Sequence, residues 1–135
     1  EGTDQWHNGG GTDFGTYKSP TDFNGYFNTD KLQAISAGYN DMMTYVRKQT
    51  NSPQTTSGWF LPSIGQLIYI KKKYAEVISK SFDKCGGAMG RGWQHHYWSS
   101  TEATAANSYN INWDSGTYSQ KNKSSGSMVR TALAF

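Results

Sequence analysis

The hydrophobic period of this 135-residue sequence changes along the chain, and that change limits the folds open to it. From about residue 30 to residue 80, apolar residues recur every three or four positions, which is typical of amphipathic helices. From about His95 they alternate at every second position, as in "SYNINWD" and "MVRTALAF", which is typical of strands. Helices followed by antiparallel strands predict an α+β fold.

Two helices are predicted in the first part. The first runs from about Asp30 to Gln49 with one apolar stripe, and Gly38 near its middle leaves open a division into two shorter helices. The second begins after Pro62, where Ser63 and Gln66 form the S-x-x-Q pattern of a capping box. Its expected buried side consists of Ile64, Leu67, Ile68 and Tyr74.

The composition supplies few aliphatic residues for a core. Hydrophobic residues make up only 35% of the chain, aromatic residues reach 15%, and there are fifteen glycines. Aromatic side chains must therefore fill much of the core, and glycine favours many turns. Residues 1–28 set aromatic residues among turn signals, so we expect a loop-rich part pinned to a single domain of residues 1–135.

No combination of residues indicates catalysis. Cys85 has no base placed near it by the sequence, and the G-x-S-x-G elbow is missing. His95 and His96 point to opposite faces of a strand, so they are not expected to bind one metal ion together. Asn112 and Asp114 share a face but supply two of the roughly six to eight oxygens that calcium prefers. We therefore predict a noncatalytic domain without a cofactor, and calcium binding stays open.

Charge is divided unevenly along the chain. Residues 1–42 hold six acidic and two basic residues, whereas the remainder holds eleven basic and four acidic residues. The basic part can attract anionic polymers, although a net charge of +3 is ordinary for a domain of this size. We expect no nucleic-acid binding. Membrane insertion is not expected either, because no run approaches about eighteen apolar residues. The single cysteine excludes an internal disulfide, which fits a cytosolic or a bacterial surface protein.

Three motifs resemble those of a bacterial surface domain. They are "GWFLPSIGQL", then "YWSSTE", and then "NWDSGTYSQKNKSSGSMVRTALAF". They are similar to the W-Y-L-P-S-x-x-E-L, Y-W-S-S-T-E and N-K-x-x-x-x-x-V-R-x-x-x-A-F signatures of the Lcl C-terminal-like family. The resemblance runs from about residue 58 to the end, and Gln66 departs from it by replacing a glutamate.

The resemblance implies a C-type-lectin-like fold, with two helices packed on a twisted antiparallel β-sheet and long loops. It also implies an extracellular place, on the bacterial cell surface or secreted, as the C-terminal part of a longer envelope protein. Classical calcium-dependent lectins resemble this chain poorly, because it has no Glu-Pro-Asn or Gln-Pro-Asp triplet. Trp59 and Trp98 lie inside the motifs and are expected in the core.

The stretch "NSYNINWDSGTYSQKNKSS" places aromatic rings among amides and hydroxyls, with Ile111 as its one aliphatic residue. Such groups stack on glycan or protein partners and form adaptable hydrogen bonds to them. Alternation puts Tyr109, Ile111 and Trp113 on one face, which we expect to serve the core. We predict that the loop–hairpin face from Trp93 to Asn122 binds a ligand. The candidate ligand-binding residues are Trp93, Tyr109, Asn110, Asn112, Asp114, Tyr118 and Asn122.

The predicted function is therefore recognition or adhesion, with a host or microbial glycan or a protein as the ligand. The alternative is a structural subunit or spacer of a bacterial surface filament such as a pilus, with other subunits as partners. The sequence leaves open the identity of the ligand, the oligomeric state and the presence of further domains.

Overall fold

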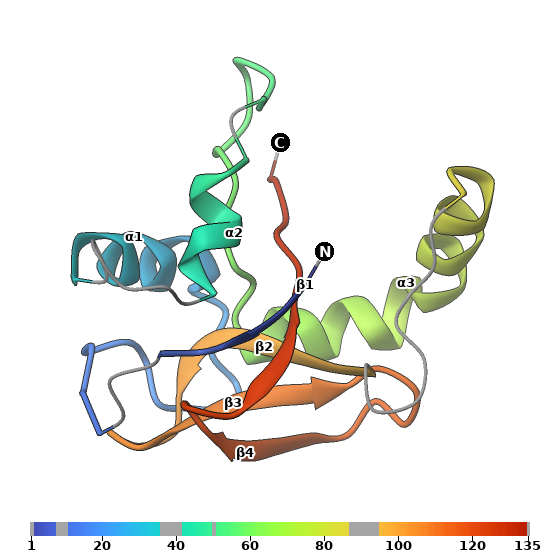
Figure 1. The fold of residues 1–135 in the computed structure, drawn as a ribbon. Coiled ribbons are helices and arrows are strands. Elements are labelled where there is room, and N and C mark those ends of the chain that lie inside the picture. The colour runs from blue at the N-terminus through green and yellow to red at the C-terminus, as the bar shows by residue number, and fades with distance from the viewer. Residues whose placement is uncertain (1, 8–10, 36–41, 50, 87–94, 135) are drawn as a thin grey trace.

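The computed structural model describes residues 2–7, 11–35, 42–49, 51–86 and 95–134. Within them the chain is an α+β protein built on a five-stranded sheet (Figure 1). In order across the sheet, the strands are β1 (Gly2–Gln5), β5 (Gly126–Val129), β2 (His96–Glu102), β3 (Asn107–Asn112) and β4 (Tyr118–Asn122). The predicted α+β class is confirmed.

The sheet is mixed, so the prediction of a purely antiparallel sheet is wrong. β5 runs parallel to β2, with Tyr97 opposite Met128, whereas the other neighbours are antiparallel. The parallel pair arises because the chain leaves β2, forms the β3–β4 hairpin on one side, and returns to the other side of β2. In the part expected to be loop-rich, residues 1–28, the described residues 6–7 and 11–24 form neither helix nor strand, whereas β1 and the start of a helix lie at its ends.

The first predicted helix is two shorter ones, α1 (Gly25–Ile35) and α2 (Met43–Arg47). Residues 36–41 between them, with Gly38, lie outside the described residues. The predicted capping box is confirmed, because α3 (Ile64–Lys84) begins directly after Ser63. The Ser63 backbone N–H donates to Oε1 of Gln66 at 2.9 Å.

The starts of α1 and α3 lie so close together that each needs a glycine. The Gly65 N–H donates to the Asp22 carbonyl at 2.9 Å, and a Cβ atom at Gly65 would lie 2.9 Å from the Phe23 ring. A Cβ atom at Gly25 would lie 2.7 Å from the backbone nitrogen of Ser63. Only glycine permits this approach, and it holds Phe23 against the first turn of α3.

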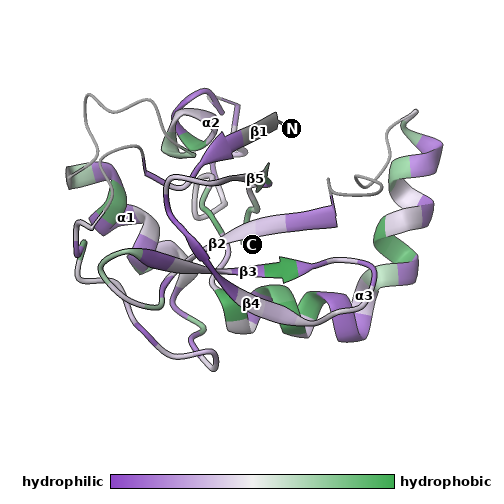
Figure 2. Ribbon diagram, turned by 60° about the horizontal axis from the view of Figure 1, so that its bottom comes forward, coloured by the Kyte–Doolittle hydropathy of each residue, from purple (hydrophilic) through white to green (hydrophobic). Residues whose placement is uncertain are grey.

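The sheet separates two aromatic-rich cores. Tyr97 and Trp98 are neighbours on β2 and point to opposite faces, so each belongs to a different core. The core that α1 and α2 cover contains Trp6, Phe14, Leu32, Met42, Met43, Val46, Leu61, Trp98 and Val129. The core under α3 contains Ile64, Leu67, Tyr97, Tyr109, Ile111, Trp113 and Met128. Figure 2 shows hydrophobic residues in the first half of α3, where it lies along the sheet.

The second half of α3 rises away from the sheet (Figure 1). Tyr74, at the middle of α3, is 48% exposed, so the prediction that it belongs to the buried side of this helix is wrong. Ile64 and Leu67, in the first half, are buried as predicted.

A buried ion pair joins two of the sequence motifs. Lys123 Nζ lies 2.5 Å from Oε1 of Glu102, and both side chains are fully buried. Lys123 also donates to the Thr12 carbonyl at 2.6 Å, while the Glu102 carboxylate accepts the backbone N–H groups of Phe14 and Thr16, each at 3.0 Å. Burial lowers the pKa of Lys123, and the hydrogen bond to Glu102 opposes that shift. The pair therefore ties the segment 12–16 to the ends of β2 and β4.

Candidate functional site

The predicted hairpin face begins with two residues that the structure buries. Tyr109 is 8% exposed and packs in the core under α3, in keeping with the core role expected for its face. Asn110 is 1% exposed, so the expectation that it faces outward is wrong. Its Oδ1 accepts a hydrogen bond of 2.8 Å from the Ser119 hydroxyl on the paired strand β4. Both residues therefore offer almost no surface to a ligand.

Three more predicted residues are at least partly exposed, and each already contacts another group of this chain. Oδ1 of Asn112 accepts the Asp114 backbone N–H at 2.9 Å, and Oδ1 of Asn122 accepts the Ser124 N–H at 2.9 Å. The Asp114 carboxylate contacts Nδ1 of His95. These contacts give each side chain a structural role, and their binding of a ligand stays a prediction.

Of the other two predicted residues, Trp93 lies outside the described residues. Tyr118 is 46% exposed, and its ring packs edge-on against Tyr109, with 5.9 Å between the centroids. Among the predicted residues that the structure describes, Tyr118 alone therefore presents an exposed aromatic ring.

Tyr118 belongs to a larger group that we call the aromatic surface, formed by Phe23, Tyr69, Tyr74 and Tyr118. Their exposed fractions lie between 46% and 55%. The centroid distances are 6.2 Å from Phe23 to Tyr69 and 6.1 Å from Tyr69 to Tyr74. The members come from the segment before α1, from α3 and from β4. No local sequence pattern marks this group, because three segments that are distant in the sequence build it.

A shallow hollow of about 320 Å³ lies within the aromatic surface. Phe23, Tyr69 and Tyr118 line it together with Pro20, Thr21, Gly65, Ile68 and Lys72. A second hollow of about 280 Å³ shares Phe23 and Tyr69 and extends to Phe60, Pro62, Gln66, Ile70, Ala132 and Leu133. The two hollows form a groove of apolar and aromatic groups in which Lys72 is the one charged residue among the described lining residues.

Neighbouring groups hold these rings in place. Phe23 follows Asp22, whose carbonyl accepts the Gly65 N–H. A hydrogen bond with Tyr74 raises the pKa of Tyr69 above the ordinary value of 10.0. Soluble domains seldom expose contiguous apolar patches without a use for them, so this group of exposed rings is a candidate interaction surface.

Two further kinds of feature, clusters of metal ligands and membrane-spanning helices, are missing from the described residues. Within the described ranges, no three His, Cys, Asp or Glu side chains lie together as a set of metal ligands. No helix in that part of the chain combines the length and the apolar character needed to cross a bilayer.

No family model matches the sequence, and no curated protein matches it either. A solved structure is similar: a fimbrial protein from Bacteroides ovatus ATCC 8483, with a TM-score of 0.76 and 20% sequence identity. The similarity covers 99% of this chain and 34% of that protein, so the chain spans about a third of its length. This chain therefore has a fold that is found in part of a bacterial fimbrial protein. Membership of the Lcl C-terminal-like family and the C-type-lectin-like assignment stay predictions.

Proposed function

We propose that this chain is a noncatalytic domain of a bacterial surface-filament protein and that its aromatic surface contacts another subunit. The observation that carries the proposal is the shared fold with a fimbrial protein over 99% of the chain. The sequence predicted this function as the alternative to ligand recognition, and the similarity to a fimbrial protein favours it.

The aromatic surface supports a protein partner on physical grounds. Tyrosine and phenylalanine rings bury a large area at a small loss of side-chain entropy, and aromatic anchors dominate the energy of many interfaces. Phe23 and Tyr69 are already held by neighbouring groups, so binding orders them little further. Lys72 is the one charged residue among the described residues that line the groove, which suits the core of an interface more than its charged rim.

Self-association of the chain tests this proposal. We expect the weight-average sedimentation coefficient to rise with protein concentration for the unaltered chain. The double variant Phe23→Ser/Tyr69→Ser should stay monomeric under the same conditions. Tyr17→Ser is the matched control, because Tyr17 is 51% exposed but lines neither hollow of the groove. A chain that stays monomeric at millimolar concentration, or a double variant that associates as the unaltered chain does, contradicts the proposal.

The second candidate is recognition of a glycan, and one observation favours it. The hollow of about 320 Å³ sets the Phe23, Tyr69 and Tyr118 rings beside the Thr21 hydroxyl and the Lys72 ammonium group. Rings stack on the apolar faces of sugars, and polar groups bind sugar hydroxyls. A glycan array should then show signals that Tyr118→Ala removes. If Asn112→Ala and Asp114→Ala remove them as well, the hairpin face takes part in binding, whereas an array without signals excludes this function for the glycans tested.

A further inference from the structure

An apolar cavity lies between α3 and the C-terminal segment that follows β5. Its volume is about 210 Å³. The second half of α3 rises away from the sheet (Figure 1), so Ile78 and Phe82 face the C-terminal segment across a space that the core under α3 does not fill. The apolar lining comes from Leu67, Ile70, Ile78, Phe82, Tyr97 and Trp113.

The core under α3 fixes one wall of this cavity. Tyr97 and Trp113 are 1% and 6% exposed, and their rings pack edge to face with 6.1 Å between the centroids. The Lys71 ammonium group lies 5.5 Å from the centroid of the Trp113 ring and holds that ring further. The wall is therefore formed before any ligand arrives, as in most small-molecule sites.

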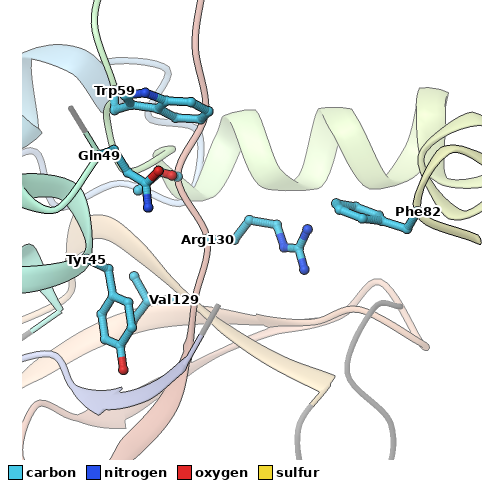
Figure 3. A pocket seen from close by; sticks show the side chains of 7 residues that line it. Tyr45, Gln49, Trp59, Phe82, Val129 and Arg130 are labelled. Carbon is cyan, nitrogen blue, oxygen red and sulfur yellow. The ribbon is translucent and has the colours of Figure 1, made fainter. Parts of the chain in front are cut away.

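Arg130 and Phe82 form the opposite wall. Figure 3 shows Arg130 reaching from the C-terminal segment toward Phe82 on α3, and its guanidinium carbon lies 4.1 Å from the centroid of the Phe82 ring. The same two residues line a neighbouring pocket of about 280 Å³, to which Tyr45, Gln49 and Trp59 contribute. To the cavity this stack contributes packing area, whatever group the Arg130 N–H groups bind.

The polarity of the lining selects an uncharged ligand. Eight of the ten described residues that line the cavity are apolar or aromatic, and no acidic residue is among them. A charged group would lose its hydration in such a space, whereas an apolar group restores dispersion contacts that the facing walls lack.

The size and the walls of the cavity favour a ring. An apolar cavity of about 150 Å³ holds a benzene molecule, so about 210 Å³ admits one ring with a short substituent. Aromatic rings gain additional energy from edge-to-face contacts with other rings. Phe82, Tyr97 and Trp113 offer such contacts from two walls.

We propose that this cavity binds a small uncharged aromatic compound of the alkylbenzene class. The ring packs among Phe82, Tyr97 and Trp113, and Ile70 and Ile78 contact its substituent. The cavity borders the second hollow of the groove, but none of the four rings of the aromatic surface lines it. The site therefore stands independently of the filament proposal.

Titration of the full chain with ethylbenzene, followed by NMR, tests the site. We expect a saturable shift of the Trp113 indole N–H signal. The Trp6 indole signal should stay in place, because Trp6 lies in the core on the other face of the sheet. Phenylacetate, which carries a charge, should bind at least about tenfold more weakly. No saturable shift of Trp113, equal affinities for the two compounds, or saturable binding of hexane without binding of ethylbenzene overturns the proposal.

Variants at neighbouring positions of α3 locate the ligand. Ile78→Trp should fill the cavity and weaken ethylbenzene binding at least about tenfold. Val77→Trp is the matched control, because Val77 is 62% exposed and does not line the cavity, so its affinity should be unchanged. Where circular dichroism shows that Ile78→Trp does not fold, Ile70→Phe adds volume at another point of the lining and should also weaken binding.

Unaltered affinity in a folded cavity-filling variant, or an equal loss in Val77→Trp, overturns the assignment to this cavity. The double variant Phe23→Ser/Tyr69→Ser should bind ethylbenzene as the unaltered chain does, because neither residue lines the cavity. Self-association and ethylbenzene binding can therefore fail separately.

Discussion

The β3–β4 hairpin and the aromatic surface share Tyr118, but most of their other side chains are used differently. In the hairpin, Asn110 is buried against Ser119, and the Asn112 side chain binds the turn that follows it. In the aromatic surface, the Phe23 and Tyr69 rings remain about half exposed. A composition typical of binding sites therefore does not by itself locate one, because local backbone groups compete for the same side chains.

Lys123 offers the strongest test of the hairpin as a structural element. Lys123→Met leaves the buried Glu102 carboxylate without its cation, and we expect a loss of about 3–5 kcal/mol in the free energy of unfolding. Urea denaturation measures this loss.

The exposed ion pair between Lys18 and Asp13 supplies the control, at 2.7 Å. Lys18→Met should cost less than about 1 kcal/mol, because solvent screens this pair. If Lys123→Met and Lys18→Met lose similar amounts of stability, the pair between Lys123 and Glu102 does not anchor the hairpin.

Gly65→Ala tests how the aromatic surface is built. The new Cβ would collide with the Asp22 carbonyl and with the Phe23 ring, so we expect a loss of about 1–3 kcal/mol in stability. Because Phe23 must move, self-association should weaken as well. Sedimentation and urea denaturation of the same variant measure both effects. Ser79→Ala, at an exposed position of α3, is the control and should change neither stability nor association. If Gly65→Ala associates as strongly as the unaltered chain, Phe23 is not part of the interface.

Asn112→Ala tests whether the hairpin contributes to stability alone or also to self-association. The variant loses the hydrogen bond that the Asp114 N–H donates to Oδ1 of Asn112, so we expect a stability loss of about 1 kcal/mol. Self-association should be unchanged, because Asn112 lines neither hollow of the groove. Thermal unfolding and sedimentation test the two halves of this expectation. If Asn112→Ala keeps its full stability but no longer associates, the contact with another subunit lies on the hairpin rather than on the aromatic surface.

Local patterns predicted much of this fold. The S-x-x-Q pattern located the start of α3 at Ser63 and Ile64, and the alternation placed Tyr109, Ile111 and Trp113, in β3 and directly after it, in the core. Both signals act within a few residues, where hydrogen bonding and side-chain alternation decide the outcome.

Contacts between distant segments were not predictable in the same way. β1 forms only because β5 pairs with it, and residues 2–5 carry no strong strand pattern. Glu102 and Lys123 look like ordinary surface charges until the fold buries them together. The aromatic surface also depends on contacts between distant segments, since Phe23, Tyr69 and Tyr118 come together only when α3 packs on the sheet.

The smallest expected effect concerns the hydroxyl groups of the aromatic surface. Tyr74→Phe removes the hydrogen bond that raises the pKa of Tyr69, so that pKa should fall toward 10.0. A raised pKa in the folded state contributes stability that is lost as the pH rises through that pKa. The variant should therefore lose stability less steeply above pH 10 than the unaltered chain. Titration of the Tyr69 ring carbon by NMR measures the shift. Self-association at neutral pH should stay unchanged if the rings rather than their hydroxyls make the contact. A loss of association in Tyr74→Phe would assign the contact to the Tyr69 and Tyr74 hydroxyls.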